Sequence, residues 1–381
     1  MSYKILILNW QDITNPYAGG AEVHLHEIFK RIAARHHTVM LGCCSYRNAK
    51  KYELIDDIEI YRHGNRNFFN FFVPRLYQEI RSSRKIDIVI DDINKIPFFT
   101  PLFVKEPIIG IVHHLFGRSI YSETSLPGAL YVRTVESMIP FIYKNTHFSV
   151  VSNSTEAELI KKGLAAENIR LIHNGVDLSR FRQTGKLKSK EPVIGYLGRI
   201  KKYKHIDHLL AAMVIIRRSV PNVTLKVIGT GDHMDSLKKY TVTLGIDDIV
   251  QFIGNVSETE KVDLLNNVWF TVNPSSKEGW GLTIIESNAC GTPVIAADSP
   301  GLRDSVVHNK TGLLYPHGNV DSLAQSAIKL IHDVKLRHKL STNAIEWSKK
   351  FNWDVSATEM LRMIDDVLQR TVTTIDEGTS S

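Results

Sequence analysis

The feature that most constrains the fold is an alternation of short apolar runs with amphipathic segments, which recurs along almost the whole chain. The first run is KILILN at residues 4–9, and its nearly unbroken apolar character is typical of a strand buried on both faces of a parallel sheet. Residues 20–35 follow with apolar side chains at helical spacing, and residues 38–42 are strand-like again. Together these segments predict a βαβ unit.

The alternation runs through the chain twice, with a polar, basic, Gly-containing stretch between the two passes. Further strand-like runs stand at 86–91, 106–113, 147–151, 193–197, 223–228, 249–253, 268–272 and 293–296. A chain of 381 residues also exceeds the usual size of about 100–200 residues for one domain. The sequence therefore predicts two doubly wound, Rossmann-like α/β domains that face each other across a cleft.

We place the domain boundaries by the changes in this pattern. The N-terminal domain is predicted at residues 1–181, an interdomain linker at 182–191 and the C-terminal domain at 192–352. An amphipathic pattern predicts a terminal helix at 353–372 that packs back toward the N-terminal domain, and a disordered tail is predicted at 373–381.

Composition narrows the class of partner. The formal net charge of +7 favours acidic ligands, such as phosphorylated compounds or anionic lipid surfaces. The chain has three cysteines, at Cys43, Cys44 and Cys290, without disulfide or metal-ligand spacing. No apolar run approaches the roughly 20 residues that span a bilayer. We expect a cytoplasmic protein that needs no metal and binds no nucleic acid.

The most informative stretch is EGWGLTIIESNACG at residues 278–291. Its glycines leave backbone N–H groups open to an anion, and the segment after them can start a helix whose positive end faces the same anion. Glu278 suits sugar hydroxyls and Glu286, about two turns into the helix, suits a ribose; alternatively they are a helix-terminal and a solvated carboxylate. The loop contributes as candidate ligands Gly279, Trp280, Gly281, Leu282 and Thr283.

Two cations follow a strand in GYLGRIKKYK at residues 195–204. Arg199 offers a rigid fork and Lys204 a point charge, which together suit the two phosphates of a nucleoside diphosphate. A solvated turn is the alternative. Gly229, in IGTGD, and Ile253, in FIG, lie at strand ends, where they could contact a nucleoside or mark tight turns.

The N-terminal half offers weaker candidates. Gly19 and Gly20 can touch a phosphate or an acceptor, but the third glycine of a dinucleotide fingerprint is missing, which disfavours a nicotinamide enzyme. His113 and His114 end a strand and alternate in direction, so at most one is functional. The aromatic and basic segment 66–85 either rests on an anionic membrane or packs into the core, and no RNA-binding signature accompanies it.

These stretches, with VSNSTEAEL at 151–159 and IHNGVD at 172–177, resemble glycosyltransferase family 4, whose members have the GT-B architecture. The resemblance covers nearly the whole chain. It implies that Arg199 and Lys204 hold the donor diphosphate, that Glu278 and Glu286 hold the sugar and the ribose, and that His113 lies near the transferred sugar.

The chain departs from the family pattern at a few positions. The lysine is usually followed by glycine where this chain has His205, and the second glutamate by alanine where it has Ser287. Neither change removes a charged contact.

The resemblance implies a retaining, metal-independent hexosyltransferase that takes its sugar from a UDP- or GDP-sugar. The acceptor is expected to be a glycan, a lipid-linked sugar or a polysaccharide of the cell envelope, with the enzyme peripheral to the inner membrane face. Two alternatives remain. The same two-domain shell could serve a sugar epimerase or phosphorylase, or a non-catalytic module that binds sugar nucleotides or membrane surfaces.

Overall fold

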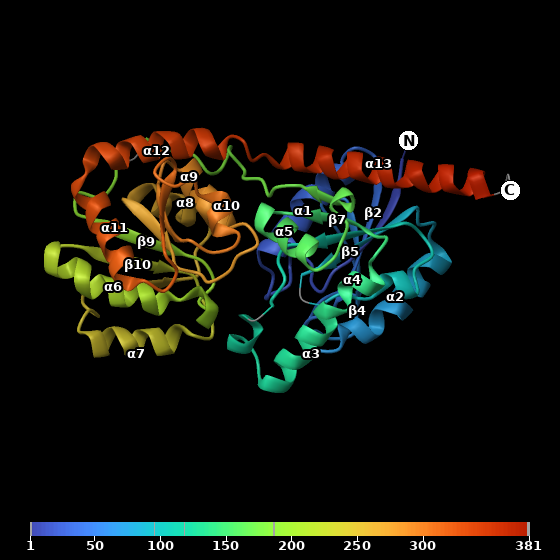
Figure 1. The fold of residues 1–381 in the computed structure, drawn as a ribbon, viewed down its shortest axis with the longest axis horizontal. Helices are drawn as coiled ribbons and strands as arrows, with labels where there is room; N and C mark the ends of the chain where they lie inside the picture. The colour runs from blue at the N-terminus through green and yellow to red at the C-terminus, as the bar shows by residue number, and fades with distance from the viewer. Residues whose placement is uncertain (1, 95, 118, 186, 379–381) are drawn as a thin grey trace. The chain divides into compact units, whose positions relative to one another are not determined.

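In a computed structural model, the described part of the chain comprises residues 2–94, 96–117, 119–185 and 187–378. The chain forms two compact units, coloured by residue number in Figure 1. Unit 1 comprises Met1–Ile120, Thr124–Gly175 and Trp353–Ser381, and unit 2 comprises Tyr121–Glu123 and Val176–Asn352. The change from unit 1 to unit 2 at Gly175 and Val176 comes six residues before the predicted end of the N-terminal domain.

Unit 1 is built on an eight-stranded sheet of order β3-β4-β2-β1-β5-β6-β7-β8. All neighbouring strands are parallel except β3 and β4, which pair antiparallel. The strands are β1 (Lys4–Leu8), β2 (Thr38–Cys44), β3 (Tyr52–Ile55), β4 (Ile58–His63), β5 (Ile88–Ile93), β6 (Ile108–Val112), β7 (His147–Val150) and β8 (Ile169–Leu171). The continuous burial of β1, β2 and β5 explains their unbroken apolar runs.

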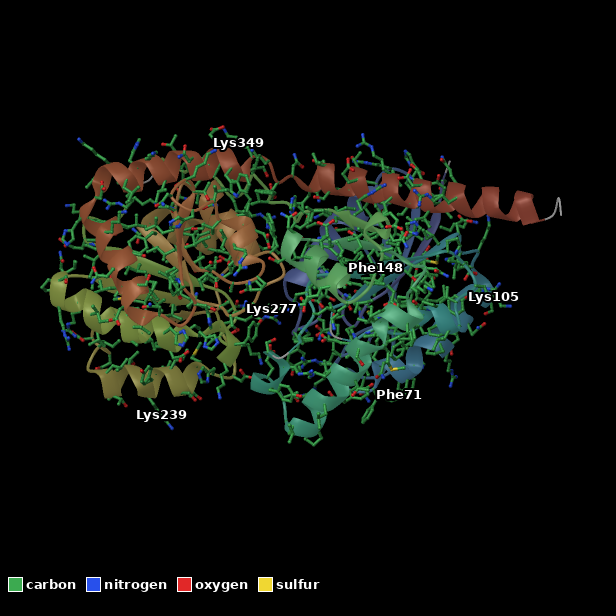
Figure 2. All side chains as sticks on the ribbon, viewed as in Figure 1. Phe71, Lys105, Phe148, Lys239, Lys277 and Lys349 are labelled. Atoms are coloured by element: carbon green, nitrogen blue, oxygen red, sulfur yellow. The ribbon has the colours of Figure 1, made fainter. Side chains whose placement is uncertain are left out.

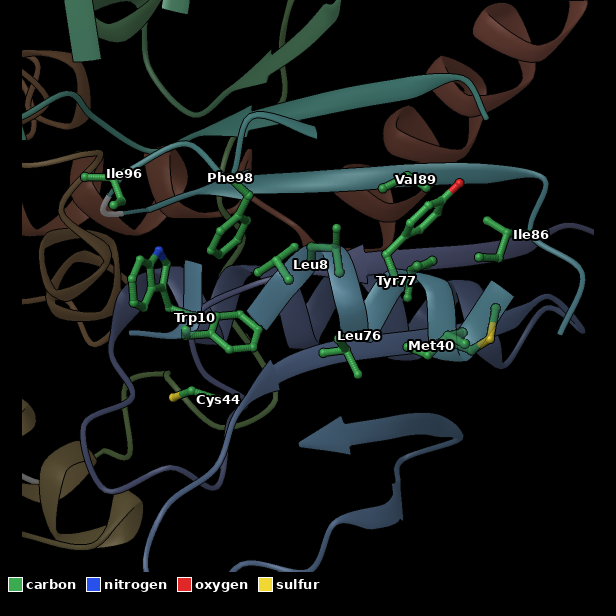
Figure 3. Close-up of a cluster of buried hydrophobic side chains, with 14 of the residues drawn as sticks. Leu8, Trp10, Met40, Cys44, Leu76, Tyr77, Ile86, Val89, Ile96 and Phe98 are labelled. Carbon is green, nitrogen blue, oxygen red and sulfur yellow. The ribbon is translucent and has the colours of Figure 1, made fainter. Parts of the chain in front are cut away.

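Helices cover both faces of this sheet (Figure 1). They are α1 (Gly20–Ala33), α2 (Phe69–Ser83), α3 (Leu126–Ser137), α4 (Ile139–Ile142), α5 (Asn153–Lys161) and α13 (Trp353–Gly378). Figure 3 shows the core beneath α2, where Leu76 and Tyr77 meet Leu8, Met40 and Val89 of three neighbouring strands. Burial of these side chains is the main force that holds the helix on the sheet.

Unit 2 is built on a six-stranded sheet of order β11-β10-β9-β12-β13-β14, parallel throughout. Its strands are β9 (Val193–Leu197), β10 (Thr224–Ile228), β11 (Val250–Gly254), β12 (Phe270–Asn273), β13 (Val294–Ala297) and β14 (Gly312–Tyr315). Its helices are α6 (Ile206–Ser219), α7 (Met234–Leu244), α8 (Glu258–Asn267), α9 (Leu282–Ala289), α10 (Leu302–Ser305), α11 (Val320–His332) and α12 (Val334–Ser348). The prediction of two parallel-sheet α/β domains is confirmed.

The described residues of the predicted linker, 182–185 and 187–191, pack on unit 2 instead of standing apart. The Thr184 amide donates to Asn266 Oδ1 at 3.1 Å, and the Ser189 amide donates to the carbonyl of Asn267 at 2.9 Å. The Trp269 indole in turn donates to the Ser189 carbonyl at 2.8 Å. The stretch lacks an apolar period because its backbone is held by polar contacts at the end of α8.

The terminal helix is longer than predicted. α13 continues to Gly378, so residues 373–378 are helical and not a disordered tail, while residues 379–381 lie outside the described part of the chain. No proline or glycine interrupts the sequence before Gly378, so nothing in it stops the helix earlier. α13 packs against α1 of unit 1, where Met360 and Ile364 are fully buried.

The aromatic and basic segment 66–85 divides between core and surface. Phe69, the first residue of α2, is fully buried, whereas Phe71 on the same helix is 71% exposed (Figure 2). Among the described residues, no helix combines the length and apolar character required to cross a bilayer.

Candidate active site

The strand order of unit 2 reverses between β9 and β12. β9 continues to β10 and β11 on one side, while β12 starts the series β12-β13-β14 on the other. The loops that leave the carboxyl ends of these two neighbours run in opposite directions and open a crevice, which is the usual ligand site of such sheets. The predicted cations follow β9 and the predicted Glu278 follows β12.

Lys204 and Glu278 form an ion pair across this point. Lys204 ends a short 3-10 turn, Lys202–Lys204, and is buried, with 9% of its surface exposed. Ser275 donates its hydroxyl to the same Glu278 oxygen, Oε1, at 2.8 Å. Burial alone would lower the pKa of Lys204, but the Glu278 carboxylate outweighs it and raises the pKa above its ordinary value. Two loops from neighbouring strands are thus joined by charge.

Arg199 stands in the same β9 loop with an exposed side chain. Its backbone is fixed, because the buried Tyr196 donates its hydroxyl to the Arg199 carbonyl at 2.9 Å. The neighbouring Lys201 pairs instead with Asp232 at 2.5 Å. The loop therefore presents its cations in different directions.

The glycine loop after Glu278 leads into α9. Gly281 takes a left-handed conformation, φ 86°, at the N-cap of this helix, where a side chain would be strained. The first-turn amides of Leu282 and Thr283 have no partner inside the helix, as in any first turn, and they carry the positive end of its dipole. Gly301 packs closely against this loop, since a Cβ there would lie 2.2 Å from the Glu278 carbonyl.

Trp280 stands between the two glycines of this loop. Its side chain is 2% exposed and packs edge-on against Phe351, with ring centroids 5.0 Å apart. The indole is an anchor of the loop in the core, because a side chain of this size between two glycines gains more from burial than from solvent. Only the backbone of Trp280 remains a candidate ligand.

Glu286 lies on α9 and pairs with a residue that the sequence did not single out. Lys261 of α8 donates to Glu286 Oε1 at 2.9 Å, and both side chains are about 15% exposed. Glu286 Oε2 is buried and lacks a hydrogen-bond partner among the described residues. Burial raises the pKa of Glu286, and Lys261 opposes that rise. One carboxylate oxygen is thus left for a further donor, such as a hydroxyl.

Gly229 lies against the loop that carries Arg199, whereas Ile253 lines a pocket beside β10 and α8. A Cβ on Gly229 would come within 2.0 Å of the Gly198 carbonyl, so this glycine is required for the close approach of two loops. Ile253, 39% exposed on β11, lines a pocket of about 520 Å³ together with Lys226, Leu264 and other residues of β10 and α8. Neither position contacts Glu278 or Lys204 in the contacts described above.

In unit 1 the glycine loop that was predicted to bind a phosphate makes hydrogen bonds to a side chain of the same unit. The Gly19 amide donates to Glu22 Oε2 at 2.7 Å, and the other oxygen of this carboxylate accepts from Asn94 at 2.9 Å. Glu22 therefore caps α1, which begins at Gly20, with its own charge. The Gly19 amide is not open to a phosphate in this arrangement, contrary to the prediction.

His113 and His114 differ as alternation requires. His113 is 6% exposed, its Nε2 lies 3.0 Å from Asp92 Oδ1, and its ring meets the buried His24 edge-on at 4.9 Å. His114 is half-buried and contacts Phe116, with centroids 5.3 Å apart. A carboxylate that orients an imidazole is the arrangement of a working histidine, so His113 is the better candidate.

Comparison with known families decides the affiliation of the chain. Residues 178–347 match the family described as glycosyl transferases group 1, and residues 18–180 match the family described as glycosyltransferase family 4. The two matches overlap at residues 178–180 and follow the division into units. The chain is thus similar to glycosyltransferases of these families over residues 18–347.

A curated relative of this chain is the D-inositol 3-phosphate glycosyltransferase of Jonesia denitrificans, 31% identical over 218 residues. The match covers 52% of this chain and 51% of the relative. The chain thus spans about half the length of the curated relatives it matches first.

Solved structures share the fold of this chain. Sucrose-phosphate synthase from Thermosynechococcus elongatus superimposes with a TM-score of 0.83 at 22% identity, covering 97% of this chain and 100% of that one. Anabaena HepE, solved with UDP and glucose, gives a TM-score of 0.76 at 20% identity and covers 96% and 100%. At this level of identity the likeness supports the two-domain GT-B architecture alone.

Proposed function

We propose that this protein transfers a sugar, with retention of configuration, from a UDP- or GDP-sugar bound by unit 2 to a glycan, lipid-linked or polysaccharide acceptor engaged by unit 1. The matches to two glycosyltransferase family models support transfer as the reaction class. Transfer to D-inositol 3-phosphate, for which the Jonesia relative is named, belongs in the same acceptor screen.

One observation carries the proposal. The Lys204–Glu278 pair joins the loops of β9 and β12 where the strand order reverses, with the N-terminus of α9 beside Glu278. A cation, a carboxylate and a helix N-terminus at one place suit a ligand that carries both phosphates and hydroxyls. A sugar nucleotide is such a ligand.

In the proposed reaction the main catalytic contribution is electrostatic. As the bond between sugar and phosphate breaks, negative charge grows on the leaving nucleoside diphosphate. Arg199, Lys204 and the first-turn amides of α9 neutralise that charge in fixed positions, so no metal ion is needed at the phosphates. Glu278 binds sugar hydroxyls, and Glu286 uses its second oxygen for the ribose.

Retention follows, in this proposal, from attack of the acceptor on the face that the diphosphate leaves, with the leaving phosphate taking the acceptor proton. The proposal gives His113, whose ring is held by Asp92, the role of orienting the transferred sugar.

The proposal is tested with the full-length chain and a panel of UDP- and GDP-sugars. A productive donor should raise the melting temperature, because it binds the folded state alone, and should release UDP or GDP when an acceptor is present. NMR of the product should show the anomeric configuration of the donor, and the rate should persist in EDTA. Inversion, or loss of the rate in EDTA, would correct the mechanism.

The two alternative functions give other outcomes. An epimerase would convert the donor sugar without glycosylating any acceptor. A binding module would show the thermal shift without nucleotide release, and a chain that responds to no sugar nucleotide would refute the donor assignment.

An exposed aromatic side chain on α2 supports a peripheral place on an anionic membrane. Phe71 is 71% exposed on the helix that also carries the exposed Arg75. Phe71→Ser should reduce sedimentation with vesicles that contain phosphatidylglycerol. Equal sedimentation of both proteins would argue against a membrane role for α2.

A further inference from the structure

Three histidines meet at one end of α6 in unit 2. His205 is the N-cap of the helix, His208 lies in its first turn, and His317 lies in the loop between β14 and α11. One ring nitrogen from each side chain can be chosen so that all three lie within 4.8 Å of one another. The His205 and His208 rings stack with centroids 4.6 Å apart, and His317 approaches them at 4.9 and 5.7 Å.

The backbone at this point is unusual. His205 takes a left-handed conformation, φ 49°, which favours glycine and is strained for a residue with a Cβ. This is the position at which the family resemblance leads us to expect glycine. The chain therefore accepts local strain to carry an imidazole beside Lys204. Packing of α6 against α11 brings His317 to the pair.

The surroundings of the rings are those of a cation site. His208 Nδ1 is buried and has no hydrogen-bond partner among the described residues. The Asp207 carboxylate lies 3.9 Å from His205 Nδ1 and 3.9 Å from His208 Nε2, too far for a hydrogen bond but close enough to offset positive charge. Three neutral imidazoles can coordinate a divalent ion, and the nearby carboxylate offsets one of its two charges.

The chemistry of the ligands selects the ion. Imidazole nitrogens suit Zn²⁺ and similar first-row ions, whereas Mg²⁺ and Ca²⁺ prefer oxygen ligands. In a tetrahedral zinc site, with bonds of about 2.0–2.1 Å, ligand nitrogens stand about 3.3 Å apart. The present separations, up to 4.8 Å, need a small inward rotation of the rings and a splaying of the stacked pair.

We propose that His205, His208 and His317 form a Zn²⁺ site that ties the first turn of α6 to the loop before α11. A bound ion fastens the backbone next to Lys204 but takes no part in the transfer of sugar, since the Lys204 ammonium is directed to Glu278. This inference rests on the histidine geometry of unit 2 and not on the proposed function.

The test uses the full-length chain without a histidine tag, stripped with a chelator and then titrated with Co²⁺ and Zn²⁺. We expect one equivalent of Co²⁺ with the visible absorption of a tetrahedral site, displaced by Zn²⁺, and a Zn²⁺-dependent rise in melting temperature. His317→Ala, at an exposed position, should weaken binding at least about tenfold without unfolding the protein. His208→Ala should abolish it.

His332→Ala is the matched control, because His332 is an exposed histidine on α11 outside the cluster. It should bind Zn²⁺ like the wild type. Failure of the wild type to bind Zn²⁺, or equal affinity and stoichiometry in His317→Ala, would overturn the proposal. Sugar transfer by the stripped protein has no bearing on this outcome, so the two proposals fail separately.

Discussion

Both units reverse their strand order, but the residues at the two reversals are of opposite kinds. In unit 1 the reversal lies between β1 and β5, where the Glu22 carboxylate accepts from Gly19 and Asn94. In unit 2, between β9 and β12, buried cations face carboxylates, and Glu286 keeps one oxygen without a partner among the described residues. Each sheet thus has a reversal at which a ligand could bind. In unit 1 the side chains there bond to one another, whereas in unit 2 they are suited to a ligand.

The comparison predicts that the largest loss of activity comes from unit 2. Arg199→Ala should reduce kcat about 10²–10³-fold, because a fixed cation is removed from the leaving phosphate. The melting temperature should stay near that of the wild type, since the Arg199 side chain is exposed. Lys201→Ala is the matched control, because Lys201 lies in the same loop as Arg199 but pairs with Asp232. Equal kinetics of both variants would remove Arg199 from the site.

The next largest effect expected is a loss of folding stability at low pH that originates in unit 1. Burial, and then the neighbouring His113, lower the pKa of His24 in unit 1 to about 3. A histidine that is neutral when folded stabilises the protein fully above its unfolded pKa of about 6.5, and this stability is lost as the pH falls from there toward 3. The loss is about 1.4 kcal/mol per pH unit, or about 2.7 kcal/mol between pH 6.5 and 4.5.

The measurement is urea unfolding at several pH values, followed in wild type and in His24→Gln. The variant should lose less stability than the wild type as the pH falls. His338→Gln, at an exposed position of unit 2, should keep the wild-type slope. A parallel pH dependence in all three proteins would mean that His24 is not the group responsible.

A smaller effect is expected at the second carboxylate of unit 2. Glu286→Gln should raise KM for the donor about tenfold, because a hydrogen bond to a charged group contributes about 1.5–3 kcal/mol and the amide keeps part of it. The control is Glu258→Gln, since Glu258 also faces Lys261 but is about half exposed. If Glu258→Gln raises KM as much, the effect belongs to Lys261 and not to a contact between Glu286 and the ribose.

The smallest effect on activity is expected from Glu22, at the point in unit 1 where the strand order reverses. Glu22→Gln places an amide against the Gly19 and Asn94 donors and should cost about 1 kcal/mol of stability, as for the loss of a helix cap. Donor KM should not change. A marked rise in donor KM would show that this loop does contact the donor, and the contrast between the units would fail.

Much of the fold was predictable from sequence because it depends on local patterns. Strands buried on both faces are read as unbroken apolar runs, and the loops that carry Lys204 and Glu278 follow such runs directly. The structure brings this pair together, as a shared sheet edge requires.

Other features depend on partners that no local pattern announces. Lys261 meets Glu286 from another helix, and His317 joins His205 and His208 only through the packing of α11. A signal was present for Glu22, since an acidic residue three positions after the helix cap is a capping pattern. Because the cap residue is a glycine, the segment was interpreted as a phosphate-binding loop.

The return of the chain to unit 1 at Trp353 has a consequence for biosynthesis. Unit 1 is discontinuous: its sheet is complete by Leu171, but α13, which packs on α1, follows unit 2 in the sequence. A Cβ on Gly175 would lie 2.4 Å from the Trp353 amide, so the two segments of unit 1 are closely fitted where they meet. During synthesis, unit 2 can therefore finish folding first, while α1 stays uncovered until α13 has emerged from the ribosome.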